Sequence, residues 1–482
     1  MNRTATGVEE ASLLGGAASS LAIPSLALSM VLASLGVSVP YVALPALTEA
    51  FGVSFQAVQW IVIAYLLTVT TLVVGIGRLG DILGHRRVLL AGIVLFTVAS
   101  IVCAAAPSFW VLIVGRAMQG AGAAALMGLT LVLVRQVVPR QATGGAMGLL
   151  GTMSAVGTAL GPTLGGLLTA GLGWRAIFLI LVPLGVLNLW LARRALPEAA
   201  EVVERDRGQF DALGTLLLGL SVGAYALALT IGGGHSGRLS FALLLGALAV
   251  GGLFVFAQSR AHSPLLQLSA LRDARLSGSL AINALTSTVI MATLVVGPFY
   301  LSRALGLGEA LVGLVVSIGP VVAALSGVPA GRLVDRFGVP IILVAGLVQI
   351  AMGSVALALL SATLGIAGYV ATIAVLTSGY QLFLAANNTS VMLDVADNQR
   401  GVISGMLTLS RNLGLTTGAS LMGAVFAFAA GTQDMQTAPP DVVAIGMRIT
   451  FAFAAALMVL ALVIAIASRW RALARARSGD DR

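Results

Sequence analysis

Residues 77–87 read GRLGDILGHRR, and residues 331–338 repeat the pattern as GRLVDRFG. Each copy lies between two long apolar runs and places glycines beside an aspartate and arginines, as a tight charged turn between two helices requires. The copies are 254 residues apart, so one unit of the chain is present twice. Two related helical bundles that face each other across a membrane usually move solutes, and the repeat therefore predicts a transporter.

The composition places the chain in a lipid bilayer. Hydrophobic residues make up 58% of the 482 residues and charged residues only 9%, with a mean hydropathy of +1.02, so polar side chains are too few to cover a water-facing surface. A run of about 20 apolar residues crosses the hydrocarbon core. We find fourteen such runs, at residues 22–47, 56–77, 88–106, 108–133, 144–170, 175–192, 212–232, 239–258, 276–301, 310–331, 340–361, 365–392, 401–430 and 442–467. The first is too long for a signal-peptide core, so we expect it to be retained.

The arginines predict how the chain is oriented. All 27 basic residues are arginines, and with both termini in the cytoplasm 21 of them fall on the inner side. Arg116 and Arg411 lie within predicted helices, and the four on the outer side are Arg175, Arg238, Arg303 and Arg448. Because basic residues concentrate in cytoplasmic loops, this bias predicts fourteen spans with both termini cytoplasmic, in an integral protein of a bacterial cytoplasmic membrane.

A second repeat defines the organisation of the chain. At an offset of 257 residues, four glycines recur: Gly144, Gly148, Gly157 and Gly161 match Gly401, Gly405, Gly414 and Gly418. Helices 1 to 6 therefore correspond to helices 9 to 14, with two helices inserted between them. We expect an N-terminal cytoplasmic segment at 1–20, an N-terminal six-helix bundle at 21–195, a linker with two inserted helices at 196–275, a C-terminal six-helix bundle at 276–468 and a cytoplasmic tail at 469–482.

Several further motifs occur in a specific order and spacing. They are VALP at residues 42–45, LIVGRAMQG at 112–120, GTALGPTLGG at 157–166, and the aromatic positions Trp60, Tyr65, Trp174 and Phe178. Together with the repeated turn, they resemble the major facilitator superfamily, specifically its fourteen-helix drug:proton antiporter branch. The resemblance covers nearly the whole chain. It implies the all-α major facilitator fold with 14 transmembrane helices arranged as 6+2+6, and multidrug efflux as the activity.

The repeated turn is a candidate conformational latch. Its aspartate and arginines form a charge cluster that is able to hold helix ends together, and in the family such clusters are associated with holding one state of the transport cycle. The resemblance carries this role to Gly77, Arg78, Asp81, Gly84 and Arg86, and to the repeated Gly331, Arg332, Asp335 and Arg336. The alternative is that Arg86 and Arg87 merely enforce the orientation. His85 we interpret as a solvated loop residue.

The fifth predicted helix carries a smooth strip of small residues. Gly157, Gly161 and Gly165 recur every four residues, so another backbone is able to approach one helix face closely, and Pro162 predicts a kink. The resemblance identifies this strip as the antiporter motif, which shapes the contact between the two halves and favours export. A plain packing groove is the alternative.

Arg116 is the first candidate for a role in the mechanism. A guanidinium inside a transmembrane helix costs several kcal/mol unless it faces water or a partner, which makes it a functional candidate by default. Gln119 and Gly120 lie on the same helix face. In the family this arginine is associated with proton coupling. A structural role, with the guanidinium bonded to carbonyls of helix 1 or 2, is the alternative.

The sequence departs from the fourteen-helix antiporters at one position. These relatives usually carry an aspartate in helix 1 shortly before the VALP element, where this chain has Gly36, and none of the 18 acidic residues lies well inside a predicted span. An exporter of lipophilic cations is therefore disfavoured. The polar candidates for the cavity, Arg116, Gln119, Asn283, Gln381, Asn387, Asn388, Arg411 and Asn412, suit an anionic or neutral polar substrate. Aromatic candidates for its lining are Tyr41, Trp60, Tyr65, Tyr300 and Tyr380.

The leading hypothesis is a secondary active exporter of amphipathic small molecules, such as drugs or secondary metabolites, that works by ion-coupled alternating access. One alternative is a dedicated exporter of a single anionic or neutral metabolite, driven by the membrane potential. A non-transporting receptor is disfavoured because the chain has no long soluble domain, and an enzyme because no catalytic constellation is present.

The expected partners follow from this hypothesis. They are a small-molecule substrate, protons and the lipid bilayer, with no nucleic acid, no metal and no cofactor, and we expect a monomer. The single cysteine, Cys103, excludes an intramolecular disulfide and a cysteine-cluster metal site.

Overall fold

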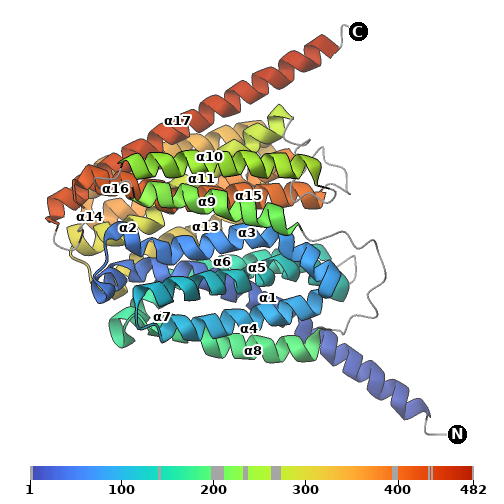
Figure 1. Cartoon of the computed structure of the whole chain (residues 1–482). Coiled ribbons are helices and arrows are strands. Elements are labelled where there is room, and N and C mark those ends of the chain that lie inside the picture. Colours follow the sequence, from blue (N-terminus) through green and yellow to red (C-terminus); the bar gives the residue numbers. More distant parts are fainter. Residues whose placement is uncertain are drawn as a thin grey trace.

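The computed structural model describes residues 4–138, 143–196, 211–231, 237–261, 273–392, 400–432, 435 and 438–479. Every regular element within these ranges is helical. Fourteen helical segments there are long and apolar enough to cross a membrane, which confirms the number of spans predicted from the sequence. They run side by side along one common direction (Figure 1).

The N-terminal bundle is built from the first eight helical elements, which form six spans. They are α1 (Thr4–Phe51), α2 (Phe55–Val58), α3 (Trp60–Leu83), α4 (His85–Ala104), α5 (Phe109–Val137), α6 (Thr143–Leu172), α7 (Ala176–Leu179) and α8 (Leu181–Ala195). Helix α1 packs against α5, α6 and α8, and α3 and α4 both pack against α5.

The inserted helices and the C-terminal bundle follow. The insertion is α9 (Ala212–Ile231) and α10 (Gly237–Arg260), and the bundle comprises α11 (Ala274–Val295), α12 (Gly297–Phe299), η3 (Tyr300–Ala304), α13 (Glu309–Phe337), α14 (Val339–Met392), α15 (Arg400–Thr417), η4 (Gly418–Met422), α16 (Gly423–Ala430) and α17 (Pro440–Gly479). Helix α14 contains two spans that meet at Gly365, where φ is 56°. Most of the expected linker, at residues 197–210 and 262–272, lies outside the described residues.

Glycines end the helices at both copies of the repeated turn. Helix α3 ends at Gly84 with a φ of 93°, and α13 ends at Gly338 with a φ of 82°. An L-residue with a side chain is strained at such angles, whereas glycine is not. The same local chemistry therefore reverses the chain at matching places in the two bundles.

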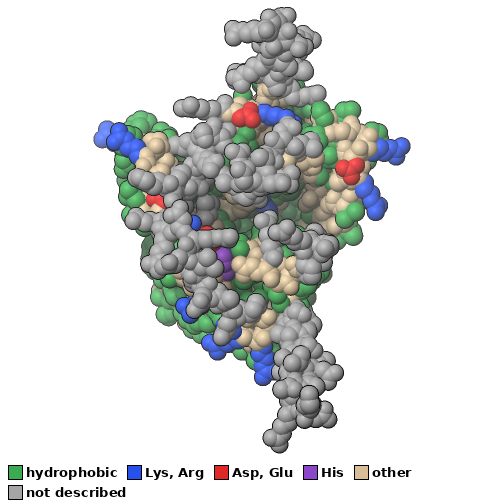
Figure 2. All heavy atoms as spheres, turned by 90° about the vertical axis from the view of Figure 1, so that its right-hand side faces the viewer, with side chains coloured by type: hydrophobic (Ala, Val, Ile, Leu, Met, Phe, Trp, Pro, Cys, Tyr) green, Lys and Arg blue, Asp and Glu red, His purple; other side chains and the backbone are tan. Residues whose placement is uncertain are grey.

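The two ends of the molecule are named here by the helices that lie there. The start of α1 and the end of α17 lie at one end, here named the terminal end, and α2 and α16 lie near the other, the distal end (Figure 1). Viewed onto the terminal end, arginine side chains lie around the rim while hydrophobic side chains cover the flanks (Figure 2). Such an apolar flank fits lipid.

Two pairs of helices make the most extensive contacts between the bundles. Helix α6 packs against α13, and α3 packs against α15. The inserted helix α9 lies over the second pair, because it contacts α3 of one bundle and α15, η4 and α16 of the other.

Candidate functional site

Arg116 lies in the interior of the N-terminal bundle and is fully buried. Its Nε donates to the carbonyl of Ile61 in α3 at 2.7 Å, and its Nη1 donates to the carbonyl of Gly36 in α1 at 2.9 Å. Nη1 also donates to Oε1 of Gln119, one turn along α5. The guanidinium carbon lies 4.4 Å from the centre of the Tyr65 ring, in cation–π contact. The charge is thus enclosed by one bundle.

The surroundings of Arg116 are themselves tied together. Gln119 donates to the hydroxyl of Ser100 in α4 at 2.8 Å, and the Tyr65 hydroxyl donates to the carbonyl of Ala33 in α1 at 2.9 Å. These contacts are the ones that the structural alternative for Arg116 anticipates. In this conformation Arg116, Gln119 and Tyr65 do not face the space between the bundles, and the proton-coupling role of Arg116 stays a prediction.

Arg411 is placed in the opposite way. Its neighbours Leu409 and Leu413 pack toward α9, and Ser410 donates to the carbonyl of Leu280 in α11 at 2.6 Å, so two faces of α15 are occupied. The Arg411 side chain projects from a third face and is exposed, although it lies midway along the helix. The guanidinium of Arg411 is therefore accessible in this conformation, whereas that of Arg116 is enclosed.

Arg411 forms no ion pair with a described residue. The ion pairs in the described part of the chain join Asp81 to Arg78 and to His85. Every carboxylate with a described side chain lies in or beside the first or last turn of a helix: Glu49, Asp81, Asp211, Asp273, Glu309, Asp335 and Asp441. Two further acidic residues near the end of a predicted span, Asp394 and Asp397, lie outside the described residues.

The amide candidates separate into enclosed and accessible groups. Asn283 and Asn387 are buried in the C-terminal bundle, where Asn283 donates to the carbonyl of Leu407 at 3.0 Å. Asn388 is exposed, and Gln381 and Asn412 are half-buried. In this conformation the accessible polar groups of the predicted cavity set all belong to the C-terminal bundle.

The aromatic candidates are mostly engaged in packing. Trp60 donates to the hydroxyl of Thr230 at 3.1 Å and so joins α3 to α9. Tyr300 stacks on Tyr369 with ring centres 6.2 Å apart, and the hydroxyl of Tyr380 lies 3.5 Å from the hydroxyl of Ser287. Tyr41, Tyr300 and Tyr380 are buried, and their role as cavity lining stays a prediction.

A cluster of apolar side chains closes the distal end between the bundles. The ring of Phe55 in α2 lies 4.6 Å from that of Phe299 in α12 and 5.2 Å from that of Phe426 in α16, measured between centroids. All three are buried. Nearby, the Tyr41 hydroxyl points to the sulfur of Met291 in α11 at 3.5 Å, again across the bundles. The sequence analysis did not single out the three phenylalanines, because isolated aromatic residues carry no pattern.

The glycine strip of α6 packs within its own bundle. A Cβ at Gly157 would lie 2.8 Å from the carbonyl oxygen of Val31, and one at Gly165 would lie 2.5 Å from that of Val39, both in α1. Gly161 faces Ser38 of the same helix. The family interpretation gave this strip the contact between the halves, but in this structure Gly157, Gly161 and Gly165 face α1.

The contact between the halves is made by neighbouring residues instead. A Cβ at Gly166 would lie 2.8 Å from the Cα of Gly313 in α13, and one at Gly313 would lie 2.5 Å from the carbonyl oxygen of Pro162. Further toward the terminal end, a Cβ at Gly151 or at Gly327 would meet nothing within 4 Å. The backbones of α6 and α13 therefore meet directly near the distal end.

The first copy of the repeated turn forms a charge cluster. The carboxylate of Asp81 lies 3.1 Å from Nε2 of His85 and 3.8 Å from Nη1 of Arg78, and Arg86 donates to the carbonyl of Arg193 in α8 at 2.9 Å. His85 is thus a partner of Asp81 rather than the solvated residue expected. Gly77 and Gly84 face open space.

The second copy of the turn is arranged differently. The guanidinium of Arg336 lies over the ring of Phe337 at 5.2 Å, and Asp335 makes no ion pair with a described residue. Arg332 is exposed, and Gly331 faces open space. In this conformation the two candidate latches are therefore unequal, and their role in the cycle stays a prediction.

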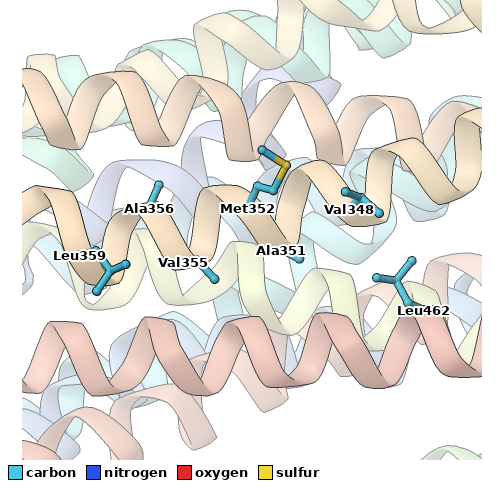
Figure 3. A pocket seen from close by; sticks show the side chains of 7 residues that line it. All are labelled: Val348, Ala351, Met352, Val355, Ala356, Leu359 and Leu462. Atoms are coloured by element: carbon cyan, nitrogen blue, oxygen red, sulfur yellow. The ribbon is translucent and has the colours of Figure 1, made fainter.

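An apolar groove of about 470 Å³ lies on the flank of the C-terminal bundle. Six residues of α14 from Val348 to Leu359 line it, together with Leu462 of α17 (Figure 3). It offers no polar group to a substrate, so it is not a candidate for the transport path.

Comparison with known proteins agrees with this architecture. The model of the Major Facilitator Superfamily matches residues 26–419 and 279–480. The uncharacterized transporter YebQ of Escherichia coli K12 is 31% identical over 402 residues, which cover 83% of this chain and 88% of YebQ. The multidrug resistance protein Stp of Mycobacterium tuberculosis is 33% identical over 398 residues, covering 80% of this chain and 72% of Stp.

A solved structure shares the fold. The bacterial homolog of the human lysosomal transporter Spinster, in its inward-facing and unoccupied conformation, superposes with a TM-score of 0.67 at 17% identity, over 94% of this chain and 97% of that one. Because the matched family is one of integral membrane transporters, the expectation that the protein is not an enzyme is confirmed. The chain belongs to the major facilitator superfamily.

Proposed function

We propose that the protein is a secondary active exporter of amphipathic small molecules that carry a negative charge or neutral polar groups. The observation that carries this proposal is Arg411, an exposed cation midway along α15, and we propose that its guanidinium faces the space between the bundles. A desolvated carboxylate would attract a lipophilic cation, but the described carboxylates lie at helix ends. The relationship to Stp, a multidrug resistance protein, supports export of drug-like compounds.

The proposed cycle alternates between two arrangements of the bundles. The arrangement seen here is closed at the distal end by Phe55, Phe299 and Phe426, and we propose that it is the one that admits substrate from the terminal end. With the terminal end in the cytoplasm, as the arginine bias predicts, a substrate enters from inside the cell and leaves when the distal end opens. We propose that a monomer suffices, because each bundle contributes its half of the path.

The driving force separates the proposal from its alternative. The leading form is coupled to an ion, in which case an imposed pH gradient alone drives flux in liposomes. The placement of Arg411 and of the described carboxylates favours a second candidate, a dedicated exporter of one organic anion driven by the membrane potential. In that case a potential alone drives flux, because an inside-negative voltage expels an anion at about 2.3 kcal/mol per charge per 100 mV.

Arg411→Ala is expected to reduce export of anionic compounds at least about 10-fold, because the substrate loses its charged partner in a partly dehydrated site. Purified protein in liposomes, loaded in turn with a panel of unrelated anionic and neutral compounds, measures this effect. Loss for many compounds supports a multidrug exporter, and loss for one supports the dedicated form. Anion flux that equals wild type would contradict the proposed site. Arg448→Ala, at an exposed position near the start of α17, is the matched control.

Asp81→Asn tests the proposed latch. The ion pair of Asp81 with Arg78 is exposed in this conformation and contributes roughly 0–1 kcal/mol. If the turn holds another state of the cycle, turnover in liposomes should fall about fivefold or more while the unfolding temperature stays within a few degrees of wild type. Asp441→Asn, an exposed acid at the other end, is the control. Unchanged turnover in Asp81→Asn would rule out the latch.

A further inference from the structure

The internal repeat places two contacts between the bundles at corresponding positions, one at Gly313 and one at Gln59. The two contacts differ in the side chain that each of these positions carries. Gly313 follows Gln59 by 254 residues, the same offset as between the repeated turns. The N-cap residues of α2 and α13 also share one backbone conformation. Ser54 has φ −67° and ψ 161°, and Gly308 has φ −67° and ψ 157°. Gln59 and Gly313 thus hold corresponding places at the distal end of the two bundles.

At one crossing, backbone packs directly on backbone. Gly313 of α13 lies against Gly166 and the carbonyl oxygen of Pro162 in α6, so closely that a Cβ on either glycine would collide with main-chain atoms. No side chain lies between the two helices at this point. Such a crossing lets the two backbones approach closely and leaves no polar side chain without a hydrogen-bond partner.

At the other crossing, a glutamine side chain takes the place of the glycine. The amide group of Gln59 lies directly against Gly423 of α16. Gln59 is only 1% exposed, and neither its Oε1 nor its Nε2 has a hydrogen-bond partner among the described residues. Gln56, one turn earlier and 6% exposed, is in the same situation with both amide atoms.

The surroundings explain why these amides are buried. Phe55 packs between Phe299 and Phe426 on one side of them. On another side, α9 covers α3, where Trp60 donates to the hydroxyl of Thr230. A buried amide without a partner is costly, whereas the same amide in water is fully hydrogen-bonded.

We propose that Gln56 and Gln59 destabilise the closed distal gate and so hold it poised to open, whereas the corresponding Gly166–Gly313 contact carries no such penalty. When the bundles part at the distal end, water reaches both amides and removes the penalty. The apolar contacts of Phe55 stabilise the closed gate, and the unpaired amides reduce the free energy needed to open it. This inference concerns the conformational equilibrium and does not depend on the identity of the substrate.

Gln59→Leu tests the proposal, since leucine has a similar volume but no amide. Spin labels at Ala50→Cys and Asp441→Cys, which are exposed residues near the distal ends of α1 and α17, report the separation of the bundles in a Cys103→Ala background. Double electron–electron resonance in nanodiscs without substrate gives the populations. We expect the distally open population to fall about 5- to 10-fold, as one unpaired amide would dictate. Gln56→Leu should shift it in the same direction.

The control removes an unpaired polar group that is not at a crossing. Thr130 in α5 is fully buried, its hydroxyl has no described partner, and α5 packs within the N-terminal bundle. Thr130→Val should therefore leave the distance distribution unchanged. An unchanged or larger open population in both glutamine variants would overturn the proposal, as would an equal shift in Thr130→Val. Because no transport is measured, failure of the proposed export activity would not produce either result.

Discussion

Gly166→Ala is expected to lower the export rate about 10-fold or more by preventing full closure of the distal end. The added methyl group would lie 2.5 Å from the carbonyl oxygen of Glu309 and 2.8 Å from the Cα of Gly313, and neither main-chain atom is able to rotate away. Overpacking of this kind costs typically about 1–3 kcal/mol, and here the cost falls only on the state in which α6 and α13 touch. Flux into liposomes and the distal distance distribution both measure the effect.

The same helix offers a matched control. A Cβ at Gly171 would meet nothing within 4 Å, so Gly171→Ala makes the same chemical change without a collision. We expect wild-type flux from Gly171→Ala and a longer distal separation from Gly166→Ala. If Gly166→Ala closes and transports like the control, α6 and α13 do not meet as described during the cycle.

Arg116→Ala is expected to destabilise the fold by about 3–5 kcal/mol, in contrast to Arg411→Ala, which should fold like wild type. Removal of Arg116 leaves a cavity in the N-terminal bundle and breaks the hydrogen bonds that tie α5 to α1 and α3. Thermal unfolding in detergent, followed by tryptophan fluorescence, should show a large drop for Arg116→Ala and almost none for Arg411→Ala. Similar unfolding temperatures for the two variants would contradict the structural role of Arg116.

Much of the fold was predictable because it depends on local sequence. The apolar runs at 340–361 and 365–392 correspond to the spans Val339–Leu359 and Leu364–Met392, and the glycines of the repeated turn end their helices with a positive φ. The length of an apolar run and the glycines of a turn are properties of one continuous stretch of sequence. These features are therefore visible without a structure.

The packing partners of single residues were less predictable. The strip that includes Gly157 and Gly165 revealed a smooth helix face, but spacing alone does not say that this face meets α1 of the same bundle. Likewise, an arginine in a helix signals a charge that needs partners, and only tertiary structure shows that the carbonyls of Ile61 and Gly36 supply them. The place of Gln59 could have been found by aligning the two halves, because Gly313 stands opposite it in the repeat.

The inserted helices lie against both bundles on one side of the molecule. Helix α9 contacts the first bundle through the hydrogen bond between Trp60 and Thr230, and it packs against α15, η4 and α16 of the second bundle. Helix α10 packs chiefly on α9 and presents large apolar side chains, such as Leu248, to the outside. Each turnover must then drag this hairpin through the surrounding acyl chains, so the viscosity of the bilayer contributes friction to the cycle.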